Sequence, residues 1–182
     1  MSPNGGHGRD VLQRAEAEAR AARVENARYE IDLELVEGRE QYVGRVVINF
    51  NLEPNDGPLF LDFDGRVTAV RVNGEDIEPD HRDYRLWFTR DQLRMHNRLV
   101  IEYQNSYVST GDGLHRFVDP EDGESYVYSN LEPFSAHRIF PCFDQPDIKG
   151  RYRLSVTVPG AWTVVSADAP VGASPLPGER QI

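Results

Sequence analysis

The sequence predicts an all-β fold, an antiparallel β-sandwich with one helix at its N-terminus. The first observation is alternation: from residue 28 onward, apolar residues occupy every second position in many short runs, as half-buried strands require. The second is spacing, because turn-forming residues separate these runs about every eight to twelve residues, which is typical of sandwiches and barrels. The third is that helix-forming composition is concentrated in one stretch before residue 28.

The helix is expected over Asp10–Ala27, where alanine recurs and the first residue can cap the N-terminus. Arg14 with Glu18 and Glu16 with Arg20 have the i,i+4 spacing of ion pairs on a helix surface. The apolar face consists mainly of alanine, which buries little area. We therefore expect this helix to lie loosely on the domain or to pack on a neighbour.

Strands are expected wherever the period is two. Asn73-Gly74 fits a two-residue type I′ hairpin turn, since both residues tolerate positive φ. Asp62, Asp64 and Gly65 are interpreted as another turn. The tail from Ala169 to Ile182 is predicted to be a loop without a further strand. The predicted strands are Tyr29–Leu35, Val46–Leu52, Leu59–Phe63, Val67–Val72, Tyr84–Phe88, Leu99–Tyr103 and Tyr152–Val158.

The domain organisation follows from these elements. Residues 1–9 are expected to form a disordered leader, residues 10–27 the helix, and residues 28–182 one β-sandwich domain that is incomplete at its C-terminus. A chain of 182 residues is long enough to bury a proper core.

Composition argues against several classes of function. The formal net charge is −10, which disfavours binding to phosphate backbones and anionic lipid headgroups. No apolar run approaches the roughly 20 residues of a membrane span. We therefore expect no nucleic-acid and no membrane partner. The single cysteine, Cys142, precludes an intrachain disulfide and is compatible with a reducing cytoplasm, so a cytoplasmic location is expected.

Sequence signals for a metal site or a nucleophile are weak. No two of the five histidines lie within five residues of each other, so the spacing of a zinc-binding helix is absent. No G-x-S-x-G and no phosphate-binding loop occurs. The acidic stretch Asp119–Glu124 departs from the EF-hand register and is interpreted as a solvated turn. Cys142, between a proline and a phenylalanine, is expected to be buried and unreactive.

One irregular segment interrupts the alternation. Residues 128–146, here called the signature segment, combine a carboxylate, aromatics, an arginine and prolines. Glu132 is the candidate binding residue, because a carboxylate in a water-excluding loop is a good receptor for an ammonium group. The alternative, which local chemistry alone favours, is that Glu132 anchors its own loop. Arg138 fits either a ligand carboxylate or a structural pair with an acid such as Asp144.

The signature segment resembles that of the N-terminal domain of the aminopeptidase N family of zinc metallopeptidases, which includes leukotriene A4 hydrolase. Runs on either side, Tyr29–Leu33, Gly113–Phe117 and Tyr152–Pro159, agree with the family as well. The resemblance covers residues 28 to about 169. The matching residues within the motif are Ser129, Asn130, Glu132, Ala136, Arg138, Phe140, Pro141, Cys142, Asp144, Pro146 and Lys149.

The resemblance implies an open, saddle-shaped β-sandwich that leans over a thermolysin-like catalytic domain. It also implies that Glu132 contacts the free amino terminus of a peptide substrate. Asn130 stands where the family has glutamine and would contact the bound peptide. Arg138, Asp144 and Tyr128 would support the loop.

The zinc site of the family lies elsewhere. Its G-A-M-E-N segment and its H-E-x-x-H zinc helix do not occur in these 182 residues. We therefore expect no catalytic residue, no metal ligand and no cofactor in this chain, and no peptide hydrolysis by the chain alone, with zinc held in the catalytic domain of a parent aminopeptidase. The alternatives are a stand-alone, non-catalytic β-sandwich binding module and a domain of an inactive homologue.

Overall fold

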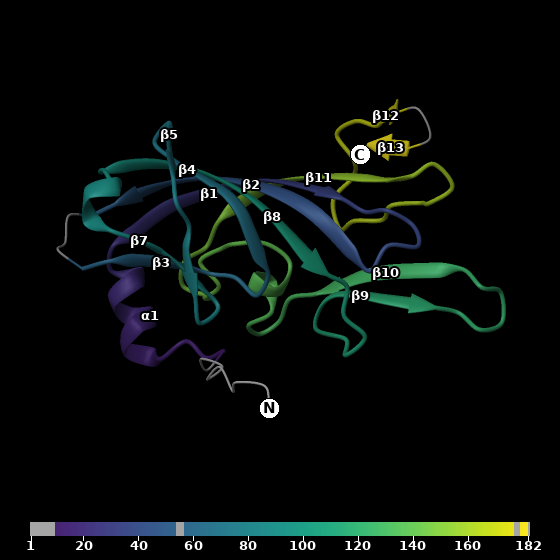
Figure 1. Ribbon diagram of the computed structural model, residues 1–182, viewed down its shortest axis with the longest axis horizontal. Coiled ribbons are helices and arrows are strands. Elements are labelled where there is room, and N and C mark those ends of the chain that lie inside the picture. Colours follow the sequence, from purple (N-terminus) through teal and green to yellow (C-terminus); the bar gives the residue numbers. More distant parts are fainter. Residues whose placement is uncertain (1–9, 54–56, 177–178, 182) are drawn as a thin grey trace.

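The computed structural model describes residues 10–53, 57–176 and 179–181. The expected leader, residues 1–9, lies outside this range. Figure 1 shows the arrangement of the elements, which are α1 (Arg14–Ala21), β1 (Val24–Glu34), β2 (Gln41–Leu52), β3 (Leu59–Asp62), β4 (Arg66–Val72), β5 (Glu75–Ile77), β6 (Asp80–Arg82), β7 (Arg85–Phe88), η1 (Arg90–Gln92), β8 (His96–Ser106), β9 (Gly113–Val118), β10 (Ser125–Asn130), η2 (Ala136–Arg138), β11 (Arg151–Pro159), β12 (Ser174–Leu176) and β13 (Glu179–Gln181).

A large sheet forms one layer of the molecule. Its strands lie in the order β12-β13-β11-β1-β2-β8-β4-β5. The predicted antiparallel arrangement holds for every pair of this sheet except β1 with β11, which is parallel. Parallel neighbours need a long crossover connection, and here the rest of the sandwich lies between the two strands in the chain.

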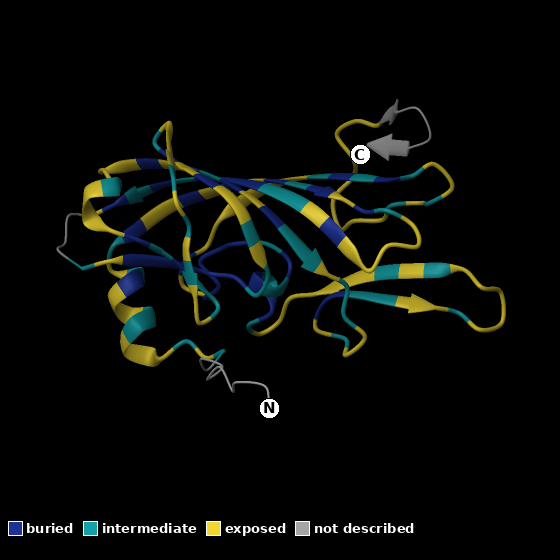
Figure 2. Cartoon of the chain, viewed as in Figure 1, coloured by how far each residue is buried: buried dark blue, intermediate teal, exposed yellow. Residues whose placement is uncertain are grey.

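The second layer consists of the three-stranded sheet β3-β7-β6 together with part of the signature segment. Side chains from both layers meet in one hydrophobic core, which includes Ile48 and Ile101 of the large sheet and Leu61 and Leu86 of the small one. All four are fully buried. Figure 2 shows buried residues on the facing sides of the two layers. The predicted β-sandwich is therefore confirmed.

Helix α1 is shorter than the predicted span of residues 10–27. It starts after Gln13, whose backbone N–H donates to the Glu16 carboxylate (3.0 Å), so Asp10 does not cap it. It ends at Ala21, because the following residues enter β1 and bury Val24 and Ala27 against the sheet. Tertiary pairing of β1 with β2 thus overrides the local helix propensity of this stretch.

The face by which α1 packs also differs from the prediction. The alanines at 15, 19 and 22 are exposed, whereas Arg20 is buried. The predicted ion pair Arg14–Glu18 forms at 2.7 Å on the surface. The predicted pair of Glu16 with Arg20 does not form, because the two side chains bind partners elsewhere in the fold. Helix α1 is therefore held by polar contacts that its alanine pattern did not reveal.

The turn at Asn73-Gly74 is confirmed, since both residues have positive φ, 52° and 95°. The hairpin of β9 and β10 was not predicted as strands; Asp119–Glu124 forms the turn between them. The tail was predicted to be a loop, but β12 and β13 form a hairpin that pairs with the end of β11. Short polar strands of this kind lack the apolar alternation on which the sequence prediction depends.

Candidate functional site

The signature segment begins in β10, which pairs with β9 in a separate two-stranded sheet. A tight turn follows β10, in which the Ser135 N–H donates to the Leu131 carbonyl (3.0 Å). We call residues 131–135 the Glu132 turn. Beyond η2, the buried side chains of Ile139, Cys142 and Phe143 anchor the segment in the hydrophobic core. The signature segment therefore has a buried stem and an exposed turn.

Glu132 lies on the exposed part. Its side chain is solvent-exposed and makes no hydrogen bond or ion pair with any residue that the structure describes. Asn130, the last residue of β10, is exposed as well and pairs through its backbone with Gly113. The interpretation of Glu132 as a loop anchor thus has no contact to support it. The carboxylate is available to a group that comes from outside the described residues.

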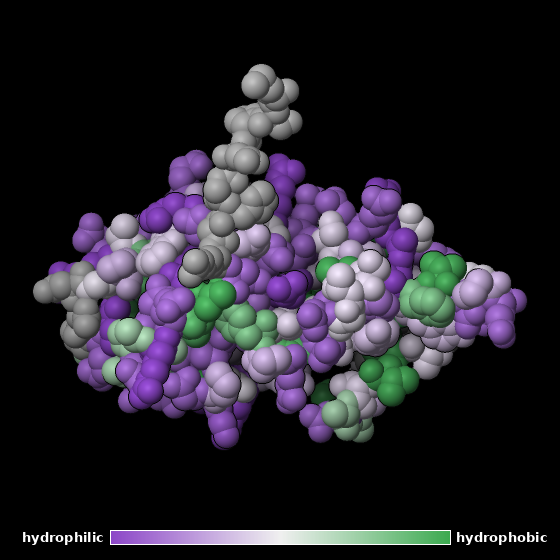
Figure 3. Space-filling view, turned by 90° about the horizontal axis from the view of Figure 1, so that it is seen from below, coloured by the Kyte–Doolittle hydropathy of each residue, from purple (hydrophilic) through white to green (hydrophobic). Residues whose placement is uncertain are grey.

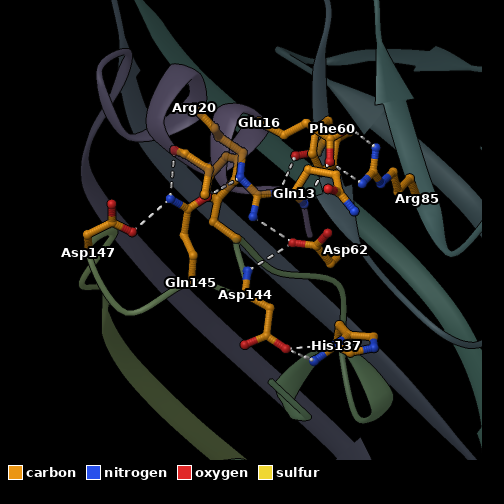
Figure 4. A network of polar contacts seen from close by, with 12 residues as sticks. Gln13, Glu16, Arg20, Phe60, Asp62, Arg85, His137, Asp144, Gln145 and Asp147 are labelled. Atoms are coloured by element: carbon orange, nitrogen blue, oxygen red, sulfur yellow. Dashed lines mark hydrogen bonds and ion pairs between the residues drawn. The ribbon is translucent and has the colours of Figure 1, made fainter. Parts of the chain in front are cut away.

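A buried polar network joins α1 and β3 to the signature segment (Figure 4). Arg20 of α1 lies 2.7 Å from Oδ2 of Asp62 on β3. The same oxygen accepts a hydrogen bond from the backbone N–H of Asp144 (3.1 Å). Burial raises the pKa of the Asp62 carboxyl, and the charge and hydrogen bond of Arg20 oppose that rise. The Gln145 side chain, in the same part of the network, accepts a hydrogen bond from Arg20 Nε and donates one to the Ala17 carbonyl.

His137 is the centre of the second part of the network, and its side chain is fully buried. Its Nδ1 lies 2.7 Å from Oδ2 of Asp144, and its Nε2 lies 3.0 Å from Oδ1 of Asp10. Because an ionised carboxylate only accepts hydrogen bonds, Nδ1 carries the proton that it donates to Asp144, and the negative charge of Asp10 next to Nε2 favours a second proton on the ring. Burial lowers the pKa of His137, but the hydrogen bond to Asp144 and the charges of Asp10, Asp144 and Asp62 outweigh it, so the pKa is raised.

The residues predicted to support the loop have different partners from those expected. Arg138 lies 2.8 Å from Oδ2 of Asp10, so the suggested pair of Arg138 with Asp144 does not form. Asp144 instead accepts from the backbone N–H (3.0 Å) and the ring of His137. Tyr128 is half-exposed on β10, where its ring stacks on that of His115 with centroids 4.6 Å apart.

Sequence reasoning missed Asp10, Arg20, Asp62 and His137 as partners. Asp62 was assigned to a turn, yet it ends β3 and is only 3% exposed. One available signal was its place at the end of an apolar run, where a carboxylate is buried only if it is paired. The partner in α1 is far away in the chain, so no local spacing could identify it.

No metal centre is present in the described part of the chain, because no group of three or more His, Cys, Asp or Glu side chains is placed to hold an ion. Cys142 is only 4% exposed, and burial raises the pKa of its thiol well above the ordinary value, as expected for an unreactive cysteine. Among the described residues, no helix combines the length and the hydropathy that a membrane span requires.

The sequence matches a known protein family. Residues 25–174 match the family model of the Peptidase M1 N-terminal domain. The chain belongs to this family. The resemblance to the aminopeptidase N group is thereby confirmed, and the match covers the small sheet, the signature segment and the strands of the large sheet from β1 to β11. Residues 10–24, with Asp10 and Arg20, precede it.

Several relatives of this M1 N-terminal domain are aminopeptidases. Aminopeptidase N of Streptomyces lividans is 35% identical over 160 residues, which cover 85% of this chain and 19% of that protein. Glutamyl aminopeptidase of Rattus norvegicus is 26% identical over 161 residues, covering 79% of this chain and 17% of that protein. The chain thus spans less than a fifth of the length of these curated relatives.

Solved structures show the same fold. The M1 zinc metallopeptidase of Deinococcus radiodurans superimposes with a TM-score of 0.70 at 23% identity, over 87% of this chain and 38% of that one. A variant of the same enzyme bound to a Tyr-Ser-Ala substrate gives a TM-score of 0.69 at 22% identity, with the same coverage. At this level of identity the likeness concerns the fold alone.

Proposed function

We propose that this M1 N-terminal domain acts as part of a zinc aminopeptidase and supplies the group that binds the free amino terminus of the peptide. The observation that carries the proposal is the Glu132 carboxylate, which is exposed and unpaired within the described residues while the loop behind it is anchored in the core. An anchored backbone with a free carboxylate is the geometry of a receptor group, because binding then costs little reordering.

An α-ammonium group is the ligand that suits this carboxylate. It carries a positive charge and three N–H donors, and a charge-assisted hydrogen bond to a carboxylate is among the stronger ones in proteins. Asn130 lies two residues before Glu132 and is exposed beside it at the end of β10, so its amide is available for a second contact with the bound peptide. Holding the amino terminus at a fixed distance from a hydrolytic centre would select cleavage of the first peptide bond.

The hydrolytic centre belongs to another part of the proposed enzyme. The relatives are zinc metallopeptidases, but the described side chains of this domain offer no set of ligands that fits zinc. We therefore assign no catalytic step to this chain and expect the zinc and its water in an adjoining catalytic domain. That domain would also cover the exposed Glu132 and exclude water from the ion pair.

The test is a chimera in which residues 10–174 replace the corresponding segment of Streptomyces lividans aminopeptidase N. Glu132→Ala and Glu132→Gln are compared in it with substrates that carry a free or a blocked amino terminus. A large loss confined to free-amine substrates supports the proposal. An equal loss with both substrates, or none, would instead favour a non-catalytic binding module or a structural domain. Location in the cytoplasm is part of the same proposal, and cell fractionation with an antibody to the chain tests it.

A further inference from the structure

Residues 10–24, which precede the part of the chain that matches the family model, contact the signature segment near both of their ends. Asp10 contacts His137 and Arg138, and ten residues later Arg20 contacts Asp62 and Gln145. We propose that residues 10–22 form a brace that positions the Glu132 turn, with His137 clamped between Asp10 and Asp144 as the connecting residue. This inference deepens the proposed function and rests on it where it concerns substrate binding.

The brace has two separate attachments to the signature segment. At the N-terminal attachment, the two Asp10 oxygens face His137 Nε2 (3.0 Å) and an Arg138 guanidinium nitrogen (2.8 Å). At the helical attachment, Gln145 bonds both to Arg20 and to the Ala17 carbonyl (3.0 Å). Two attachments restrict rotation of the loop in a way that a single one does not.

The helix itself is fastened to the small sheet. The Glu16 carboxylate makes two short contacts with the Arg85 guanidinium of β7, at 2.6 and 2.7 Å. The Arg20 guanidinium lies over the ring of Phe60 with its central carbon 4.5 Å from the centroid. Since β3 and β7 belong to the sandwich, the brace connects the scaffold to the signature segment rather than extending freely into solvent (Figure 1).

The Glu132 turn contacts His137 through an aromatic side chain. The ring of Phe134, two residues after Glu132, lies on the imidazole of His137 with centroids 4.3 Å apart. The Ser135 N–H closes the turn onto Leu131. The turn therefore rests on the His137 ring through Phe134, and the orientation of that ring is set by the carboxylates on either side of it.

His137 lies in a cluster of charged side chains. Asp10 comes from the N-terminal stretch, Asp144 from the signature segment and Asp62 from β3, and all three raise the affinity of His137 for a proton. Arg20 and Arg138 are the cations of the same cluster and neutralise Asp62 and Asp10. With His137 protonated, its Nδ1 donates a charge-assisted hydrogen bond to Asp144, and its positive charge faces the Asp10 carboxylate 3.0 Å from Nε2; without that proton, the attraction to Asp10 is lost.

The experiment uses Asp10→Asn in the 182-residue chain, which removes the charge and keeps the side-chain size. Amide hydrogen exchange is followed by NMR at Ser135 and His137, whose N–H groups close the turn and bond to Asp144. Exchange there should rise about tenfold or more, while amides in β2 and β8 change less than about twofold. Asp10→Glu, which keeps the charge, should preserve most of the protection.

Glu18→Gln is the matched control, because Glu18 lies in α1 and its side chain pairs with the exposed Arg14 rather than with the signature segment. It should leave exchange in the Glu132 turn unchanged. The inference is overturned if Asp10→Asn leaves the turn as well protected as the control does. It is also overturned if protection falls by the same factor in the turn and in the central strands, since Asp10 would then contribute only to global stability.

A kinetic measurement separates this inference from the proposed function. In the chimera, Asp10→Asn should raise KM for free-amine substrates severalfold with little change in kcat, and should add nothing once Glu132 is alanine. If Glu132→Ala has no effect on activity, the proposed function fails, yet the exchange result still decides whether the brace holds the turn. If Asp10→Asn acts equally with and without Glu132, positioning of that residue is contradicted.

Discussion

The guanidinium of Arg20 lies 2.7 Å from the carboxylate of Asp62, and these side chains are only 2% and 4% exposed. The pair joins helix α1 to strand β3 in the small sheet, and the backbone N–H of Asp144 bonds to the same carboxylate. One buried ion pair therefore connects the N-terminal helix, the sandwich and the signature segment.

Removal of one partner of this pair should destabilise the domain strongly. Arg20→Met leaves the Asp62 carboxylate buried without its cation, which costs about 3–5 kcal/mol and, at roughly 2–4 °C per kcal/mol, lowers Tm well beyond experimental error. Arg14→Met should leave Tm unchanged, because that side chain is exposed. Thermal unfolding followed by circular dichroism measures both. The double variant Arg20→Met with Asp62→Leu should recover part of the loss; a double variant less stable than Arg20→Met would contradict this account.

Stability should depend on the protonation of His137. Its pKa in the folded chain is raised above 6.5, so its contribution is fully present below about pH 6.5 and is lost as pH rises through the folded-state pKa. The free energy of unfolding, measured by urea titration, should therefore decline in this window.

Three variants check that His137 causes the decline. His137→Gln should abolish it, Asp10→Asn should move it to lower pH, and His96→Gln should retain it, since the exposed ring of His96 bonds to the Asn51 amide rather than to a carboxylate. A decline that persists in His137→Gln would assign the pH dependence to another group.

Glu132→Ala in the chimera should lower kcat/KM for free-amine peptides roughly ten- to 150-fold, because one charge-assisted hydrogen bond to the ammonium group is lost. Glu132→Gln should lose less, since the amide keeps an acceptor oxygen. Zinc content should be the same in all variants. Steady-state kinetics with amino-acyl chromogenic substrates measures these effects, and a change within twofold for Glu132→Ala would argue that the residue does not bind the amine.

Cys142 should be inert toward thiol reagents in the folded chain. It lies in the hydrophobic core, and burial disfavours the thiolate that reacts. Labelling with a chromogenic disulfide should therefore proceed only as fast as the chain opens, and rapidly in denaturant. Stoichiometric labelling within seconds under native conditions would show that the signature segment opens far more readily than its packing indicates.

Strand β11 should promote weak self-association. Tyr152 and Leu154 pair in register with the buried Tyr29 and Ile31 of β1, yet they are 67% and 40% exposed. β13 pairs only with Thr157–Pro159, so the first half of β11 has no second neighbour among the described strands. Hydrophobic residues also reach the surface toward the end of the molecule where β9 and β10 lie (Figure 3).

Sedimentation velocity at rising concentration tests this expectation. Tyr152→Ser combined with Leu154→Ser should reduce the dimer fraction. Val43→Thr is the control, since Val43 is 39% exposed on a different strand and should leave the dimer unchanged. A monomer at every concentration would show that the exposed face of β11 does not promote self-association.

Much of the fold could be predicted because its signals are local. The alternation in β1, β2, β8 and β11 depends only on which side of a strand each residue faces, and the Asn73-Gly74 turn depends on two backbone conformations. The motif of the signature segment likewise placed Glu132 within an irregular loop, and the structure puts that residue on an exposed turn.

The sequence by itself determined the sandwich, the family and the segment that carries the candidate site. Only the tertiary structure decided that Arg20 pairs with Asp62 rather than Glu16, that Asp10 contacts His137 rather than capping α1, and that β11 runs parallel to β1. The physical reason is the range of the interactions. Apolar periodicity depends on neighbouring residues. A buried charge is instead paired with the opposite charge that the completed fold brings next to it, and here those partners lie more than forty residues away along the chain.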